Sequence, residues 1–400
     1  WDQASNITLV EDNVHVGFDV SYTNDDLNRL SRAQEGTWNG SSITSEKRDQ
    51  EWTLTHTGNW ELDKLDLTGD NDWGDANEHQ DDRTHNEVNE LTARDTDDNG
   101  SDNFTLSYDE AGNLIDDGEN YKYVYDVFYR LRKVLDRSDD SIVAEYKYNG
   151  NGHQISIHED TDTDGDVDGS DKWFHMAYDE AWRPVAIFRE SDTSPKEEYV
   201  LHQAGYDGMG GSSYINAVIC RDRDHNTAWT TASDTVLERR DYFCQNWRGD
   251  VSVLIKYSGA ATMAEWAKFT SYGIPIGLPF ADADSDGDRD LTDVSTINAL
   301  VSYDVRGDID LDGDNDSTDE TLAGASTSTM GLFVLSDVGS RCGYAGYVFD
   351  EPLSGAVWHV RHRVLDSVLG RWLRRDSLSY LDAVSLYVYS ESSPVANLDP

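Results

Sequence analysis

The stretch Tyr108-Asp109-Glu110-Ala111-Gly112-Asn113-Leu114 carries the pattern that decides the fold of this chain. The same order of aromatic residue, acid, short turn, polar or basic residue and return strand recurs at 22–30, 125–131 and 178–184. Aspartate side chains stabilise turns by accepting hydrogen bonds from nearby backbone N–H groups. Each copy therefore predicts a β-hairpin in which the tyrosine packs on the sheet and the aspartate caps the turn. One hairpin cannot bury its own apolar face, so we expect the copies to lie side by side.

The segments around these copies alternate in the manner of strands. Aromatic and β-branched residues recur with period two in 121–125, 142–148 and 251–257, with Gly, Asn and Asp between the runs. Helical periodicity is scarce. Many short strands with regular turn signals predict a mostly β fold.

Acidic residues dominate the composition of the chain. The 32 Lys and Arg stand against 78 Asp and Glu, which gives a formal net charge of −46 over 400 residues. Such a surface repels a phosphate backbone and excludes nucleic acid as a partner. The 12 Trp, 21 Tyr and 10 Phe are more aromatic surface than a disordered acidic chain needs, so we expect a folded protein. No apolar run approaches the ~18 residues of a membrane span.

The C-terminal part of the chain carries a series of more specific motifs. They are Gly343-Tyr-Ala-Gly-Tyr-Val-Phe-Asp350, Trp358-His-Val-Arg-His-Arg363, Leu369-Gly-Arg-Trp-Leu-Arg-Arg375-Asp376, Leu386-Tyr-Val-Tyr389 and Ser393-Pro394-Val-Ala-Asn-Leu-Asp399-Pro400. This series resembles the RHS-associated core of the YD-repeat (RHS-repeat) family, and the Tyr-Asp copies extend the resemblance over most of 20–280. The resemblance implies a β ribbon wound into a spiral wall, and hence a scaffold rather than a pocket enzyme.

The expected architecture is a YD/RHS-type spiral of antiparallel β-hairpins with a small inserted helical module. We expect the β scaffold to occupy residues 1–280 and the inserted module, with paired calcium loops, to occupy 281–325. The RHS-associated core would then occupy 326–400.

Three acidic segments have the residue spacing of an EF-hand calcium loop. Each has aspartate at positions 1, 3, 5, 7, 9 and 12 and glycine at position 6, so that oxygen ligands converge and the chain can turn sharply. The expected ligands are Asp160, Asp162, Asp164, Asp166, Asp168 and Asp171 in the first loop, Asp282, Asp284, Asp286, Asp288, Asp290 and Asp293 in the second, and Asp308, Asp310, Asp312, Asp314, Asp316 and Asp319 in the third. An all-oxygen ligand set favours Ca²⁺ over zinc or copper.

Other interpretations of these acidic segments stay open. A single such loop could be a solvated turn, and position 12 is Asp rather than the usual bidentate Glu, which predicts modest affinity. A partial copy begins at Asp95, whereas 66–75 lacks the glycine and is interpreted as a turn. The second and third loops resemble a dockerin module. The helix expected after the third loop is stopped by Gly324, which favours an inserted calcium-stabilised module over cohesin binding.

The only catalysis that the sequence suggests is self-cleavage. Toxin-type RHS proteins carry an aspartyl self-cleaving site in the core, and the matching residues here are Arg375, Asp376 and Asp399. Two carboxylates in one site can act as an acid and base pair. The structural alternative is that Asp376 pairs with an arginine and Asp399 caps a turn. Ser377 and Ser379 depart from the Pro and Gly of the family pattern.

Three cysteines, Cys220, Cys244 and Cys342, show no metal-binding spacing. They allow at most one disulfide, and buried free thiols are the simplest interpretation.

Three functions follow from these features. The first is an extracellular or cell-surface, calcium-stabilised scaffold that self-associates through free sheet edges into a surface structure or filament. The second is the processed shell of a secreted RHS toxin. The third is an adhesin or a carbohydrate- or cohesin-binding module, in which Trp38, Trp52, Trp60 or Trp73 could stack on a surface glycan. Adaptation to high salt would be a separate explanation of the acidity.

Overall fold

The computed structural model describes two compact units of the chain. Unit 1 comprises Trp1–Tyr125, Asp136–Asp140 and Leu369–Asp399, and unit 2 comprises Asp126–Leu135 and Ser141–Val368. The described residues are all of 1–400 except 16, 76–77, 163, 181, 203–215, 258–260, 279–280, 285–287, 325–327, 330, 333–334, 336–338, 354, 377–384 and 398–400. The sequence-based division into 1–280, 281–325 and 326–400 stays a prediction.

Unit 1 is built from antiparallel strands that follow one another in the sheet as they do in the sequence. Strands β1 to β8 form one sheet, and β9, β10 and β11 pair in order. The strands are β1 (Leu9–Val10), β2 (Asp19–Asn24), β3 (Leu30–Trp38), β4 (Ile43–Leu54), β5 (Trp60–Asp66), β6 (His79–His85), β7 (Leu91–Asp95), β8 (Phe104–Thr105), β9 (Ser107–Tyr108), β10 (Leu114–Asp116), β11 (Tyr121–Tyr125) and β29 (Arg371–Trp372).

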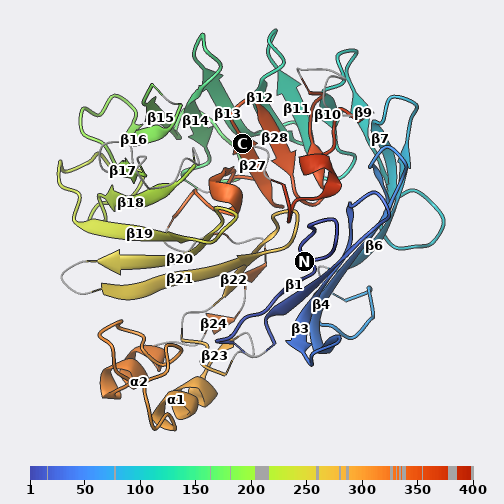
Figure 1. Ribbon diagram of the computed structural model, residues 1–400. Helices are drawn as coiled ribbons and strands as arrows, with labels where there is room; N and C mark the ends of the chain where they lie inside the picture. The colour runs from blue at the N-terminus through green and yellow to red at the C-terminus, as the bar shows by residue number, and fades with distance from the viewer. Residues whose placement is uncertain are drawn as a thin grey trace. The chain divides into compact units, whose positions relative to one another are not determined.

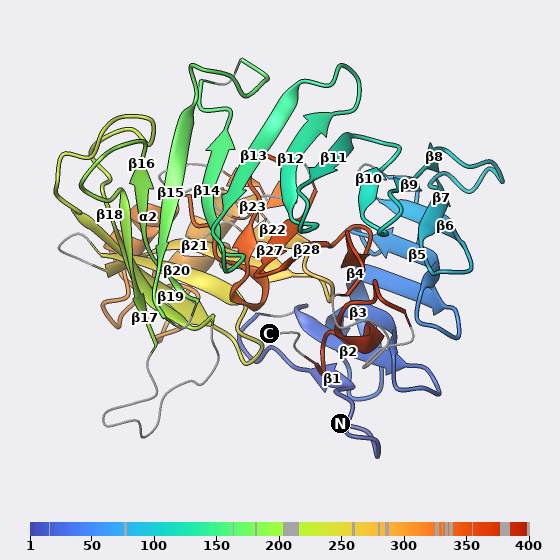
Figure 2. The ribbon, with the colours of Figure 1, turned by 90° about the horizontal axis from the view of Figure 1, so that it is seen from above.

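Unit 2 continues the same construction with longer strands, and Figures 1 and 2 show β13 to β21 side by side in chain order. Its sheet runs from β12 to β22 and ends at β25, always antiparallel. The elements are β12 (Leu131–Asp136), β13 (Ile142–Tyr148), β14 (Gln154–Glu159), β15 (Lys172–Tyr178), β16 (Pro184–Arg189), β17 (Glu197–Leu201), β18 (Val218–Arg223), β19 (Arg239–Gln245), β20 (Val251–Tyr257), β21 (Ala261–Phe269), β22 (Pro275–Leu278), β23 (Asp288–Arg289), α1 (Leu291–Asn298), α2 (Ser317–Ala323), β24 (Ser328–Thr329), β25 (Gly331–Leu332), β26 (Val348–Phe349), β27 (Val357–Val360) and β28 (Arg363–Asp366).

Period-two burial explains why these segments form strands. In β13 the side chains of Ala144 and Tyr146 are buried, whereas Lys147 between Tyr146 and Tyr148 points outward over the Trp173 ring. One face of each strand is thereby removed from water, which is the main stabilising term of such a sheet. The expectation of a mostly β fold of antiparallel hairpins with a small helical insert is confirmed.

A five-residue turn recurs nine times in the described part of the chain. In each copy the first residue's N–H donates to the carbonyl of the fifth residue, and the fourth residue's N–H donates to the carbonyl of the first. The first side chain also accepts the N–H of the fifth residue. The turns are 25–29, 55–59, 86–90, 109–113, 126–130, 149–153, 179–183, 246–250 and 270–274.

The predicted role of the aspartate in the Tyr-Asp copies is confirmed by these turns. The side chains of Asp109, Asp126 and Asp179 cap their turns in this way, with N···O distances of 2.9 to 3.1 Å. The fourth residue of every copy has a positive φ, which glycine adopts most readily. Tyr129 and Trp182 take this conformation despite their bulk, at φ 61° and 65°.

The segment that follows β25 packs on one face of the unit 2 sheet, and Figure 2 shows β27 and β28 on the inner side of its curve. The Trp358 indole is fully buried and donates to the carbonyl of Gly273 at 3.0 Å. The Tyr344 hydroxyl donates to the carbonyl of Ser271 at 2.8 Å. Both aromatic residues belong to the motifs of the resemblance, so these motifs supply the packing against the sheet.

The two helices of unit 2 form a small module with its own core, drawn in orange near β23 and β24 in Figure 1. Ala283, Ile297, Ile309 and Ala323 make up most of that core, with Val294 and Leu322 against it. Helix α2 ends at its C-cap Gly324, as the sequence predicted. Within the described residues no helix is long and apolar enough to cross a membrane.

Candidate metal centres

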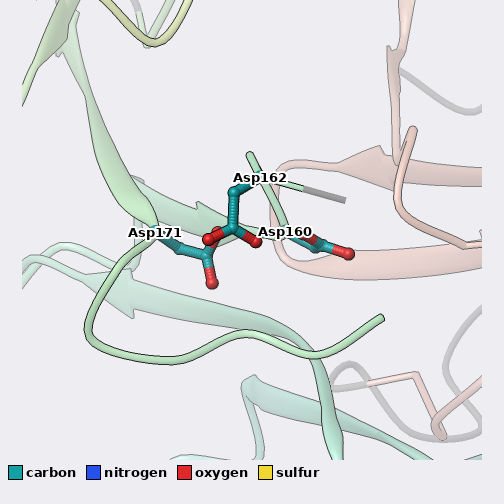
Figure 3. Close-up of side chains that lie close together, drawn as sticks. All are labelled: Asp160, Asp162 and Asp171. Atoms are coloured by element: carbon teal, nitrogen blue, oxygen red, sulfur yellow. The ribbon is translucent and has the colours of Figure 1, made fainter. Parts of the chain in front are cut away.

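The first acidic loop connects the end of β14 to the start of β15. Asp160, Asp162 and Asp171 each offer a carboxylate oxygen, and these three atoms lie within 4.8 Å of one another. Figure 3 shows the three side chains drawn together from the two ends of the loop. Because these residues hold loop positions 1, 3 and 12, the structure brings together half of the predicted ligand set.

The Asp171 carboxylate closes this loop. Its Oδ1 atom accepts the N–H of Thr161 at 2.7 Å, and its Oδ2 atom accepts the N–H of Asp168 at 2.8 Å. Gly165 has φ 107° and donates its N–H to Asp160 Oδ2 at 3.0 Å. The positive φ at position 6 directs this N–H group at the first carboxylate of the loop, and glycine is the residue that adopts such a φ most readily.

The carboxylates of this loop repel one another. Desolvation and the charges of Asp164 and Asp171 raise the pKa of Asp162, and desolvation with Asp164 and Asp168 raises the pKa of Asp166. Desolvation also acts on Asp171, but the N–H groups of Asp168 and Thr161 outweigh it and lower its pKa. A divalent cation among these oxygens would relieve the repulsion.

The second loop repeats the arrangement at the start of α1. Asp282, Asp284 and Asp293 place carboxylate oxygens within 4.8 Å of one another. Asp293 again closes the loop, accepting the N–H of Ala283 on Oδ1 and that of Asp290 on Oδ2, both at 2.7 Å. Asp290 also caps α1. The predicted ligand Asp286 lies outside the described residues, and only the backbone of Asp288 is described.

The third loop has the same geometry at the start of α2. Asp308, Asp310 and Asp319 form one group of converging oxygens, and Asp314 and Asp316 form a second group with Asp319. Asp319 accepts the N–H of Ile309 at 2.6 Å and that of Asp316 at 2.8 Å.

Electrostatic strain in the third loop resembles that in the first. Desolvation, followed by the charges of Asp312 and Asp319, raises the pKa of Asp310. Asp312 is also the main cause of the raised pKa of Asp314. Oxygen-only donors at positions 1, 3 and 12 of all three loops fit a hard cation such as Ca²⁺.

Two further segments share part of this geometry. In 66–78, Asn71 has φ 64° and donates its N–H to Asp66 Oδ2 at 2.8 Å, while Leu67 donates to Glu78 Oε1 at 2.8 Å. In the partial copy, Gly100 donates to Asp95 at 2.7 Å. Sequence reasoning missed Glu78, because its position one residue beyond the usual end of the loop falls outside the spacing rule.

The residues considered for self-cleavage lie in unit 1. Arg375 pairs with Glu90 at 2.6 Å, and its Nε donates to the Tyr387 hydroxyl at 3.1 Å. The backbone N–H of Asp376 donates to the carbonyl of Leu386. Asp399 lies outside the described residues. The proposed pairing of two aspartates therefore stays a prediction.

The three cysteines are free thiols, with Cys220 and Cys342 buried and Cys244 exposed. Burial raises the pKa of Cys342 to about 12, so this thiol stays protonated at neutral pH. Of the tryptophans considered for glycan stacking, Trp52 and Trp60 are buried and pack against each other, with ring centroids 5.7 Å apart.

The antiparallel meander of capped hairpins, with the C-terminal motifs packed against it, defines an RHS-like β-sheet fold. No protein-family model matches the sequence, and no curated protein matches it significantly.

Solved structures give a more particular likeness. The whole chain superposes on part of a chain in the Photorhabdus luminescens Tc holotoxin pore, with a TM-score of 0.59 and 13% identity. It also superposes on part of a chain in the TcdB2-TccC3 crystal structure, with a TM-score of 0.57 and 14% identity. The chain spans 16% and 17% of the length of these two chains, and at this identity the likeness concerns the fold.

Proposed function

We propose that this chain forms a wall segment of the shell of a secreted RHS-type toxin. The observation that carries the proposal is the fold likeness over 100% of the chain to parts of Tc toxin structures, at TM-scores of 0.59 and 0.57. A long antiparallel meander suits a wall, because each strand pairs with both neighbours and few backbone groups stay unpaired. The protein carried inside such a shell would be a separate polypeptide or segment.

Calcium has a stabilising role in this proposal. The residues that would hold it are those at positions 1, 3 and 12 of the three loops, with the remaining predicted aspartates completing the shell of oxygen ligands. Binding to the folded form alone would raise the stability of the wall and offset part of the charge of −46.

Self-cleavage of the shell is the one catalytic step that we include in the proposal. Asp376 and Asp399 would act as acid and base in the hydrolysis of one main-chain peptide bond, and Arg375 would position the chain. The base takes a proton from water, the water oxygen attacks the carbonyl carbon, the C–N bond breaks, and the acid donates its proton to the leaving nitrogen. Intact-mass measurement of the wild type and of Asp376→Asn tests this step. Two fragments from the wild type and the intact chain from the variant support self-cleavage. The same pattern of masses from both proteins excludes it.

A calcium-dependent surface scaffold or filament is the second candidate, favoured by the three converging carboxylate groups. Electron microscopy of the purified protein, with calcium and after chelation, separates the two. Closed hollow particles that persist after chelation support the shell. Ordered fibres that come apart on chelation support the scaffold and contradict the shell.

A further inference from the structure

A cavity of about 520 Å³ lies in unit 2 beside the first acidic loop. Its carboxylates are Glu159, Asp160 and Glu351, and its apolar walls include Ile142, Val143 and Pro352. This volume lies in the range that binds small organic molecules, ~300–1,000 Å³. The cavity therefore has the size and the mixed lining of a ligand site.

One of the three carboxylates is already neutralised and belongs to the wall. Glu159 is only 6% exposed, and Arg341 Nη2 donates to its two oxygens at 2.6 and 2.8 Å. The Trp229 indole N–H lies 3.4 Å from the same carboxylate, and the Trp229 ring stacks on Phe174. These contacts fix Glu159 as a rigid part of the cavity.

The other two carboxylates decide which ligand the cavity fits. Arg341 also interacts electrostatically with Glu351, but one guanidinium against three carboxylates leaves the lining anionic. Asp160 is half-buried at the start of the acidic loop. Glu351 is exposed and lies in the segment between β26 and β27. An anionic ligand would be repelled by these two groups and by a chain of charge −46. A cation with an aliphatic body would satisfy both the carboxylates and the apolar walls.

We propose that this cavity binds a primary ammonium group on an aliphatic chain, with Glu351 and Asp160 as its counter-ions. Ile142, Val143 and Pro352 would contact the methylene groups. A lysine side chain and a free diamine share this chemistry. The proposal concerns a ligand that the shell function does not require.

Asp160 couples the cavity to the acidic loop. The same carboxylate accepts the N–H of Gly165 at 3.0 Å and lies with Asp162 and Asp171 in the converging group. A calcium ion in the loop would engage Asp160 and cancel part of its attraction for the ammonium. By linkage, calcium and the ammonium ligand then weaken each other's binding by the same factor. This coupling, unlike the cavity, rests on calcium binding by the loop.

Calorimetric titration with 1,5-diaminopentane and with Nα-acetyl-lysine amide, at physiological salt with a chelator present, tests the cavity. We expect binding that weakens about fivefold in Glu351→Gln, because one counter-ion is lost. The matched control is Glu110→Gln, an exposed carboxylate in unit 1, which should change affinity less than about twofold. Tighter binding of the diamine would indicate a free diamine as ligand, and tighter binding of the amide a lysine side chain.

Three results would overturn the proposal for the cavity: neither probe binds, 1,5-pentanediol binds equally well, or Glu351→Gln and Glu110→Gln weaken binding equally. The calcium arm tests the coupling separately. We expect millimolar calcium to weaken the ammonium ligand about fivefold, and Asp162→Asn to reduce this effect. If calcium binds, as a parallel titration shows, and the ligand affinity is unchanged, the coupling is wrong while the cavity site stands.

Discussion

The Nη1 atom of Arg130 donates a hydrogen bond to the main-chain carbonyl of Asn149 at 2.9 Å. Arg130 is the fifth residue of one turn, and Asn149 is the first residue of the next turn on that edge of the unit 2 sheet. Arg29 makes the same contact with the carbonyl of Thr55 in unit 1, at 2.7 Å. The basic residue of the repeat therefore ties one hairpin turn to the next.

Replacing this arginine should destabilise unit 2. Arg130 also pairs with Asp126, its Nε donating at 2.7 Å, and its guanidinium lies over the Tyr148 ring. We expect Arg130→Ala to lower the free energy of unfolding by about 1–2 kcal/mol, since charged hydrogen bonds are lost at a partly exposed site. Urea denaturation measures the change.

Arg132→Ala is the matched control, because Arg132 is exposed on the neighbouring strand β12. It should change stability by no more than about 0.5 kcal/mol. An equal loss in both variants would mean that the link between turns contributes nothing specific.

Calcium titration should reveal three sites, and removing one ligand should weaken one of them. Asp310 holds position 3 of the third loop, and desolvation, followed by the charges of Asp312 and Asp319, raises its pKa. We expect Asp310→Asn to lower the calcium affinity of one site about tenfold, because a charged ligand becomes neutral while its size is kept. Isothermal titration calorimetry distinguishes the weakened site from the two unchanged ones.

The control for this variant is Asp26→Asn, which removes the same charge from an exposed turn. Its three affinities should match those of the wild type. Magnesium should replace calcium poorly, because it requires a tighter octahedral shell. A titration that shows no saturable calcium binding would mean that the three loops are solvated turns and not calcium sites.

The stability of unit 1 should fall on acidification because of His85. Burial, and then the charges of Arg371 and Arg83, lower the pKa of His85 from 6.5 to about 3. Below pH 6.5 the unfolded chain binds a proton on His85, whereas the folded form does not bind this proton until about pH 3. His85 should therefore contribute a loss of about 1.4 kcal/mol per pH unit as the pH falls through this window.

Unfolding free energies measured from pH 7 downward for the wild type and His85→Gln isolate this contribution. The variant should lose less stability per pH unit than the wild type. His56→Gln, which alters an exposed histidine, should keep the wild-type slope. Parallel pH profiles for the wild type and His85→Gln would show that His85 titrates normally in the folded protein.

The sequence predicted the turns that begin with aspartate and missed those that do not. Asp109, Asp126 and Asp179 follow a tyrosine and were recognisable as a repeat. Thr55 and Asn149 begin turns with the same hydrogen bonds, but neither residue is an acid, so neither matches the Tyr-Asp pattern. The backbone requires only a side-chain acceptor at the first position and a positive φ at the fourth, so a residue pattern underestimates the repeat.

The acidic loops were predictable as ligand sets but not as closed structures. The spacing rule predicted Asp171, Asp293 and Asp319 as ligands. In the structure each of these carboxylates also accepts hydrogen bonds from the backbone N–H groups at positions 2 and 9 of its loop. The cavity beside Asp160 could not be predicted, because Glu351 reaches it only through the tertiary fold.

Gly273 tests how closely the C-terminal motifs pack on the sheet. It is the fourth residue of its turn, with φ 96°, and a Cβ atom there would lie 2.7 Å from the Tyr344 ring. Tyr344 cannot move aside easily, because it is buried and its hydroxyl is bonded to Ser271. We expect Gly273→Ala to lower the free energy of unfolding by about 3 kcal/mol, because backbone strain and overpacking act together.

Gly152 occupies the same turn position at φ 90°, but the nearest atoms to its Cβ, on His362, would be 3.4 Å away. Gly152→Ala should therefore show the backbone strain alone, about 1 kcal/mol. Equal losses in urea denaturation would mean that the aromatic motif is packed loosely enough to accept a methyl group.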